Sequence, residues 1–208
     1  MENVTDRRSN PFDMTPPCDR FVPGYGDANA HFHVVGDHPK RHGGLDSGVP
    51  FTDMPASDRL CRVLEECGLL SAVGPPPEVN RTFLSYLCQC VPAGSEPSRD
   101  EYAATEPFFD AELRAITAHV LLPVGDRAIR HVLETYTARQ PPADPSTLHA
   151  TELRGGGFLV LPVADPSGWR SDDETALRDA LRTLQRTDYR READLGRFVA
   201  DDEPYFVR

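Results

Sequence analysis

The sequence reads HFHVVGDHP at residues 31–39. The run alternates and then becomes continuously apolar, which is typical of a buried β-strand, and the tetrapeptide Gly-Asp-His-Pro ends it. Three later runs, at 82–88, 119–124 and 158–163, are apolar in the same way and stop at Gly, Pro or polar residues. These four runs predict the strands of a buried sheet.

Segments with helical character lie between and after these strands. Helices are expected over residues 56–70, 98–117, 126–133 and 172–184. Ser98 with Glu101 three residues on is a capping-box pattern, which marks the start of the second helix. Strands that alternate with helices imply parallel crossover connections. We therefore predict the α/β class, a three-layer α/β/α fold with a central, mostly parallel four-stranded sheet.

The domain organisation follows from length and composition. A chain of 208 residues fits one domain. Residues 1–22 are polar and predict an extended N-terminal arm, 23–186 form the domain, and 187–208 are a charged C-terminal extension. No run approaches the roughly 18 apolar residues that cross a bilayer, and the N-terminus lacks the apolar stretch of a signal peptide. We expect a cytoplasmic monomer with no membrane partner.

The chain is strongly acidic, and its charged residues have an unusual composition. The net charge is -11, Asp outnumbers Glu, and Lys40 is the only lysine. This pattern suggests a halophile, although an Arg-rich chain from a GC-rich genome is the alternative. In a halophile, repulsion between carboxylates at low salt predicts salt-dependent folding, and an unchanged thermal melt between molar KCl and dilute buffer would contradict it. An acidic chain is not a general DNA-coating protein, so any DNA contact is local.

The five cysteines do not form a recognisable metal motif. They are odd in number and lack repeated C-x-x-C spacing. Disulfides are not expected in a reducing cytosol. Cys61 and Cys67 lie in a helical pattern and are interpreted as core or surface thiols.

Polar residues follow each predicted strand, and in an open parallel sheet these ends meet at one edge, where ligands bind. They are Asp37 and His38, Gln89 and Cys90, Gly125 and Asp126, and Asp165 and Ser167. The segment 36–44 matches neither the phosphate-binding loop nor the dinucleotide fingerprint. Its carboxylate at Asp37 suits water orientation, and Lys40, Arg41 and His42 suit phosphate binding. The alternative is a turn cap followed by solvated charges.

Seven short segments together resemble one known family. In order they read VPGYGDA (22–28), GDHP (36–39), GVPF (48–51), CVPAG (90–94), EYAATEPF (101–108), HVLLPVG (119–125) and LPVADPS (161–167). This ordered set resembles the iron-sulfur (family 4) uracil-DNA glycosylases. The resemblance implies an α/β/α fold that flips a deaminated base out of DNA, its partner, and hydrolyses the glycosidic bond.

The resemblance also implies roles for individual residues. Phe51 stands where the family stacks an aromatic ring on the flipped base. Asp37 stands where the family has a Glu that helps to place the attacking water, and a carboxylate there stabilises an oxocarbenium-like sugar. Tyr86, or Ser85 if the alignment shifts by one residue, stands where the family has an Asn that reads the uracil edge.

The loop after the last strand departs from the family. Asp165 replaces a His that donates toward the departing uracil oxygen, and an ionised Asp cannot donate. Either His38 supplies the proton or positive charge, the chemistry is weaker, or the substrate differs. Pro166 and Ser167 remain as a turn that can touch DNA phosphate. We predict catalytic roles for Asp37, His38 and Asp165.

The family's iron-sulfur cluster is predicted to be absent. The family uses four cysteines, and here Cys18 and Cys90 occupy two positions, Thr105 stands at a third, and the partner near Met14 is missing. Two thiolates do not hold a four-iron cluster. We expect no cofactor and no metal.

Two functions remain open. The first is a glycosylase of altered specificity that excises uracil or another deaminated base. The second is a non-catalytic relative that binds DNA or a protein partner through the same loops. An unrelated hydrolase is a lesser alternative, without the G-x-S-x-G nucleophile motif.

Overall fold

A computed structural model describes residues 15–190 of the chain. The predicted N-terminal arm and C-terminal extension lie largely outside these residues and stay predictions. Within the described part, no helix is both long and apolar enough to cross a membrane.

The centre of the fold is a six-stranded sheet with the order β1-β5-β2-β6-β8-β7. The bounds are Tyr25–Gly26 (β1), Phe32–Gly36 (β2), Thr82–Tyr86 (β5), Val120–Pro123 (β6), Leu153–Gly155 (β7) and Phe158–Val160 (β8). The four inner strands, β5, β2, β6 and β8, are parallel. The predicted parallel strands are therefore confirmed.

The sheet is wider than the predicted four strands because a short antiparallel strand lies along each edge. β1 has only two residues and β7 only three. Strands of this length carry no periodicity that the sequence could show. They cover the backbone edges of the two outer parallel strands.

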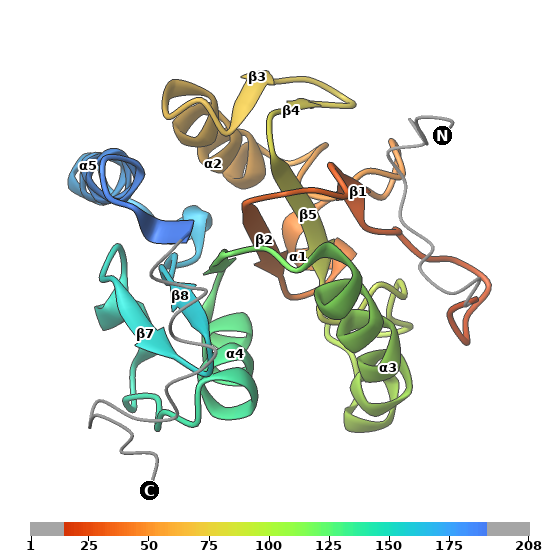
Figure 1. Ribbon diagram of the computed structural model, residues 1–208. Helices are drawn as coiled ribbons and strands as arrows, with labels where there is room; N and C mark the ends of the chain where they lie inside the picture. Colours follow the sequence, from red (N-terminus) through yellow and green to blue (C-terminus); the bar gives the residue numbers. More distant parts are fainter. Residues whose placement is uncertain (1–14, 191–208) are drawn as a thin grey trace, which may run out of the picture.

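Helices cover both faces of the sheet and complete three layers (Figure 1). The helices are Pro39–His42 (α1), Pro55–Glu66 (α2), Arg99–Ile116 (α3), Asp126–Tyr136 (α4) and Ser171–Gln185 (α5). Two 3₁₀ turns lie at Pro145–Leu148 (η2) and Pro166–Gly168 (η3). The strands Leu70–Ala72 (β3) and Glu78–Val79 (β4) form a separate two-stranded sheet. α2 and α5 share a core with Val34 and Leu122. The neighbouring residue Leu121 faces α4 on the other side. The predicted α/β/α fold is confirmed.

The start of α3 is set by its capping box. The Ser98 hydroxyl accepts a hydrogen bond from the Glu101 backbone N–H, and the Glu101 carboxylate accepts one from the Ser98 N–H. Reciprocal caps of this kind satisfy two backbone donors that the first turn leaves open. The cap fixes where α3 begins and so places Tyr102 in its first turns.

One cysteine expectation was wrong, because Cys18 and Cys90 form a disulfide with 6.0 Å between their Cα atoms. The chain before β1 runs antiparallel to the segment after β5: Phe21 pairs with Cys90, and the Val22 N–H donates to the Gln89 carbonyl. This pairing brings the two sulfurs together. Cys61, Cys67 and Cys88 are free and buried.

Candidate active site

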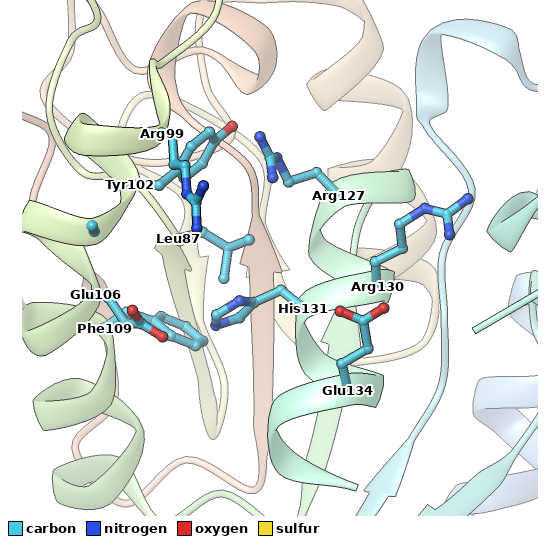
Figure 2. Close-up of a pocket in the computed structure, with 10 residues that line it drawn as sticks. Leu87, Arg99, Tyr102, Glu106, Phe109, Arg127, Arg130, His131 and Glu134 are labelled. Carbon is cyan, nitrogen blue, oxygen red and sulfur yellow. The ribbon is translucent and has the colours of Figure 1, made fainter. Parts of the chain in front are cut away.

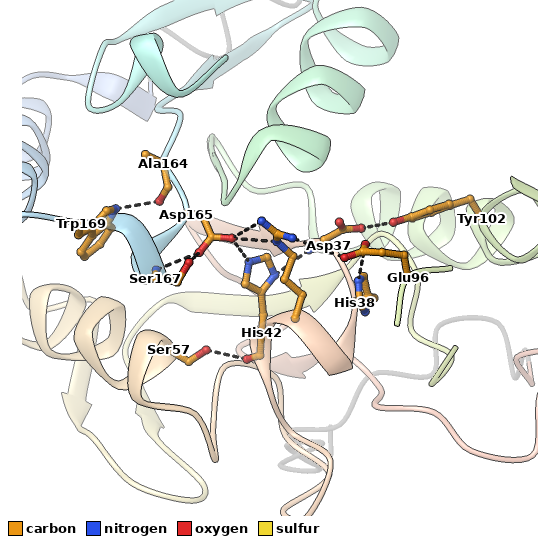
Figure 3. A network of polar contacts seen from close by, with 11 residues as sticks. Asp37, His38, His42, Ser57, Glu96, Tyr102, Ala164, Asp165, Ser167 and Trp169 are labelled. Atoms are coloured by element: carbon orange, nitrogen blue, oxygen red, sulfur yellow. Dashed lines mark hydrogen bonds and ion pairs between the residues drawn. The ribbon is translucent and has the colours of Figure 1, made fainter. Parts of the chain in front are cut away.

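Four segments meet at the carboxyl ends of the parallel strands (Figure 3). They are the loop after β2 with α1, the loop after β5 that carries Glu96, the first turns of α3, and the turn η3 after β8. The predicted convergence of Asp37, His38 and Asp165 at one edge is what the structure shows. Side chains from distant parts of the sequence therefore form one polar network.

Asp37 directly follows β2 and is 4% exposed. Its Oδ1 accepts a hydrogen bond of 2.5 Å from the Tyr102 hydroxyl. Burial raises the pKa of this carboxyl, and the Tyr102 hydrogen bond partly opposes that shift. Among the described residues, Tyr102 is the only side chain that hydrogen-bonds to this carboxylate. Oδ2 receives no hydrogen bond from a side chain in the described part of the chain.

Arg41 links the other two candidate catalytic residues. Its Nε and Nη2 each lie 2.8 Å from Asp165 Oδ2, and its Nη1 lies 3.6 Å from Glu96 Oε1. Glu96 Oε2 lies 3.0 Å from His38 Nε2. The predicted phosphate-binding Arg41 is thus engaged by two carboxylates in this structure.

His42 was expected to bind phosphate together with Lys40 and Arg41, but the structure places it in the interior. It is 1% exposed, and desolvation lowers its pKa to about 4, so the ring is neutral at pH 7. Its Nδ1 accepts a hydrogen bond of 3.0 Å from the Asp37 backbone N–H. The single ring proton therefore sits on Nε2. Nε2 has no hydrogen-bond partner in the described chain and lies 3.9 Å from Asp165 Oδ2.

Two of the candidate base-binding residues fill the space behind His42. Phe51 is 1% exposed and stacks on His42, with 5.5 Å between ring centroids. Tyr86 is fully buried, and its hydroxyl accepts a hydrogen bond from the Phe51 N–H and donates one to the Gly43 carbonyl. Both sides of this hydroxyl are therefore used by the backbone.

Ser85 lies on the opposite face of the sheet from Tyr86, since neighbouring residues of a strand alternate. Its hydroxyl lies 2.7 Å from His33 Nε2 in the core. The structure does not bring Ser85 to the site, whereas it places Tyr86 beside Gly36 in the register of β2 and β5.

The remaining candidate DNA-binding residues shape the loops. Lys40 Nζ donates to the Gly94 carbonyl at 2.7 Å and so ties α1 to the loop after β5. Asp165 Oδ1 accepts from the Ser167 N–H and hydroxyl and caps η3, where Pro166 is buried. Burial opposes ionisation of Asp165, but the hydrogen bonds from Ser167 and the charge of Arg41 outweigh it and lower its pKa. Asp165 is an acceptor here.

The residues at the cysteine positions do not fit a four-iron cluster. Cys18 and Cys90 are bonded to each other. Thr105, at the third position, donates its hydroxyl to the Glu101 carbonyl at 2.9 Å. Met14 lies outside the described residues. A disulfide and a hydroxyl supply no thiolate ligands for the iron atoms of such a cluster.

One group of described side chains has ligand atoms close enough to share a metal ion. Asp37, His38 and Glu96 place these atoms within 4.8 Å of one another. A third carboxylate, Asp165, is held away by Arg41. The three offer an incomplete shell, with Asp37 and His38 already hydrogen-bonded to Tyr102 and Glu96.

Sequence reasoning missed Tyr102, Glu96 and Arg127. Tyr102 contacts Asp37, Glu96 contacts His38, and the Arg127 guanidinium lies 4.0 Å from the centre of the Tyr102 ring. Tyr102 lies inside the segment 101–108 that carried the family resemblance, but the residue itself had no assigned role. No local pattern marks Glu96 or Arg127.

Comparisons with known proteins agree with the fold and the motifs. A family model described as the uracil DNA glycosylase superfamily matches residues 23–185. The chain is 27% identical over 175 residues to a type-5 uracil-DNA glycosylase of Mycobacterium bovis, which covers 80% of this chain and 65% of that relative. It is 29% identical over 153 residues to a type-5 uracil-DNA glycosylase of Pyrobaculum aerophilum, covering 71% of this chain and 66% of the relative.

A third relative, a type-5 uracil-DNA glycosylase of Thermus thermophilus, is 28% identical over 160 residues, covering 74% of this chain and 69% of the relative. The chain thus spans about two thirds of the length of these relatives, and 65% of the mycobacterial one. All three carry the type-5 name, whereas the motif segments pointed to the iron-sulfur family 4.

Proposed function

The chain belongs to the uracil DNA glycosylase superfamily, and from this membership and the site geometry we propose that it is a DNA glycosylase of altered base specificity. The proposal rests mainly on the position and environment of Asp37. It is a buried carboxylate at the end of a central parallel strand. Tyr102 hydrogen-bonds to one of its oxygens, and no side chain of the described residues hydrogen-bonds to the other.

Asp37 acts on water in the proposed reaction. The water oxygen forms a bond to the sugar C1′ while the bond from C1′ to the base nitrogen breaks, and the bonding electrons leave with the base. The proton of the water passes to Asp37. The same negative charge stabilises the oxocarbenium-like sugar as the base departs.

His42 is the proposed donor to the departing base. Asp165 is an acceptor, and His38 Nε2 already lies 3.0 Å from Glu96. Two buried ring nitrogens at this edge lack a hydrogen-bond partner among the described residues, His42 Nε2 and His38 Nδ1. The proposal takes His42, because its Nδ1 accepts from the Asp37 N–H and its Nε2 therefore carries the proton. A hydrogen bond from it to a base oxygen satisfies a donor whose isolation costs roughly 1–3 kcal/mol.

The altered specificity rests on Tyr86. A side-chain amide reads a base edge because it offers a donor and an acceptor together. Tyr86 has neither free, since its hydroxyl binds the backbone of Phe51 and Gly43. We propose that base recognition relies on shape and on backbone groups, which admits deaminated bases besides uracil.

A strand-cleavage assay tests the function. Single- and double-stranded oligonucleotides that carry uracil, hypoxanthine or xanthine are incubated with the protein in molar KCl, and abasic sites are cleaved with alkali. Excision of any of these bases supports a glycosylase and names its substrate. Binding of these strands without excision of any base would instead assign the non-catalytic, DNA-binding alternative.

The pH dependence of excision is expected to follow the ionisation of the Asp37 carboxyl group. A general base works only when ionised, so the rate falls as the pH drops through its pKa, which burial places above the usual range of an aspartate. The hydrogen bond from Tyr102 holds this pKa down. We therefore expect Tyr102→Phe to move the acidic limb of kcat/KM to higher pH. An unmoved limb in the variant would contradict the assignment of Asp37 as the base.

A further inference from the structure

A pocket lies between α3 and α4 (Figure 2), and Tyr102, one of its lining residues, also hydrogen-bonds to Asp37. Its volume is about 400 Å³, in the range of small-ligand sites. Arg99, Tyr102 and Arg127 line one end, and Phe109 and His131 line the other. The proposed mechanism uses none of these residues except Tyr102.

The first end of the pocket is cationic. In the part of the chain that the structure describes, no carboxylate lies within ion-pair distance of Arg99 or Arg127. Unpaired arginines beside one another are notable in a chain of net charge -11. The guanidinium fork matches the oxygens of a phosphate group. The guanidinium carbon of Arg127 also lies over the Tyr102 ring, 4.0 Å from its centre.

The other end offers an aromatic ring flanked by charged side chains. The Phe109 and His131 rings meet edge to face with 6.0 Å between centroids. Burial lowers the pKa of His131, so this ring is uncharged at neutral pH. Glu106, Glu134 and Arg130 also line this end (Figure 2). Phe109 is buried, so the half-buried His131 ring is the one that a ligand in the pocket can reach. A nucleobase suits this end, because its face stacks on such a ring and its N–H groups donate to carboxylates.

We propose that the pocket between α3 and α4 is a subsite for one nucleoside monophosphate unit. Its phosphate lies on Arg99 and Arg127, and its base lies against His131. The unit is either a free nucleotide or a nucleotide of a DNA strand. In the second case the inference rests on the proposed function, and the unit neighbours the nucleotide that is hydrolysed beside Asp37, since Tyr102 contacts both sites.

Calorimetric titration of the intact protein with thymidine 5′-monophosphate and with thymidine tests the site at one fixed salt concentration. The monophosphate is expected to bind about tenfold or more tightly than the nucleoside, because a charged hydrogen bond contributes about 1.5–3 kcal/mol. Arg99→Gln and Arg127→Gln are each expected to weaken its binding by about tenfold. The matched control is Arg114→Gln, in the last turn of the same helix as Arg99, and it is expected to change nothing.

Three results would overturn the site: equal binding of nucleoside and monophosphate, no binding of either, or equal losses in the control and the pocket variants. The titration needs no base excision, so a failed glycosylase assay leaves it standing.

A competition experiment separates the two sources of the nucleotide. If the pocket holds part of a strand, a saturating uracil-free thymidine decamer displaces the bound monophosphate, and Arg127→Gln weakens decamer binding in fluorescence anisotropy. If the pocket holds a free nucleotide, the monophosphate stays bound beside the decamer. Either result supports the subsite and identifies its occupant.

Discussion

Replacing Asp37 with asparagine is expected to lower the rate of base excision by about 10²–10⁴-fold, the usual contribution of a general base. Asparagine keeps the size of the side chain and still accepts the Tyr102 hydrogen bond through its amide oxygen. It cannot take a proton from water, and it offers no negative charge to the sugar. The loss therefore reports chemistry and not shape.

DNA binding by the Asp37→Asn protein is expected to stay within a few fold of the unchanged protein, since one buried carboxylate that faces the reacting sugar adds little to strand affinity. The control is Asp179→Asn, an exposed residue within α5 that makes no hydrogen bond or ion pair with the described residues of the site network. Excision by the Asp37→Asn protein at the original rate would remove Asp37 from the mechanism. A lower Tm in this variant alone would point to a structural role instead.

Gly43→Ala is expected to destabilise the fold by more than about 4 kcal/mol, which is the exceptional end of single substitutions. Gly43 ends α1 with a φ of 91°. A Cβ there would lie 1.8 Å from the Thr52 carbonyl oxygen, which is backbone and cannot rotate away. That carbonyl also accepts the Gly44 N–H, so relief requires the loop that carries Phe51 to move.

Gly68→Ala is the matched control for this substitution. Gly68 also has a positive φ, 75°, but no atom lies within 4 Å of an added Cβ. Its cost is therefore limited to backbone strain, about 1 kcal/mol. Both variants are compared by denaturant unfolding in molar KCl. Similar stabilities for the two would show that the contact between residues 43 and 52 does not hold the site loop in place.

Much of the fold could be predicted because its signals are local. The strand at 31–35 and the helix capped by Ser98 each appear in the order of apolar residues or in one short motif. The edge strands β1 and β7 could not be predicted in this way, because what defines them is pairing with a distant strand and not periodicity. The disulfide of Cys18 and Cys90 depends likewise on a pairing across 72 residues.

The candidate site, too, could be predicted only in part from the sequence. Its position was predictable, because parallel strands place the residues that follow them at one edge, and Asp37 and Asp165 are found there. The protonation state of His42 was not, since it depends on burial under Phe51 and on the backbone N–H of Asp37. A histidine in a row of basic residues looks charged until its surroundings are known.

The sequence by itself determined the α/β/α class, the parallel direction of the central strands and the loops that carry the chemistry, because periodicity and turn residues act over a few positions. Only the tertiary structure decided which side chains meet. Tyr102 reaches Asp37 across 65 residues, and Arg41 reaches Asp165 across 124. Such contacts depend on how helices pack against the sheet, and packing is set by the whole core at once.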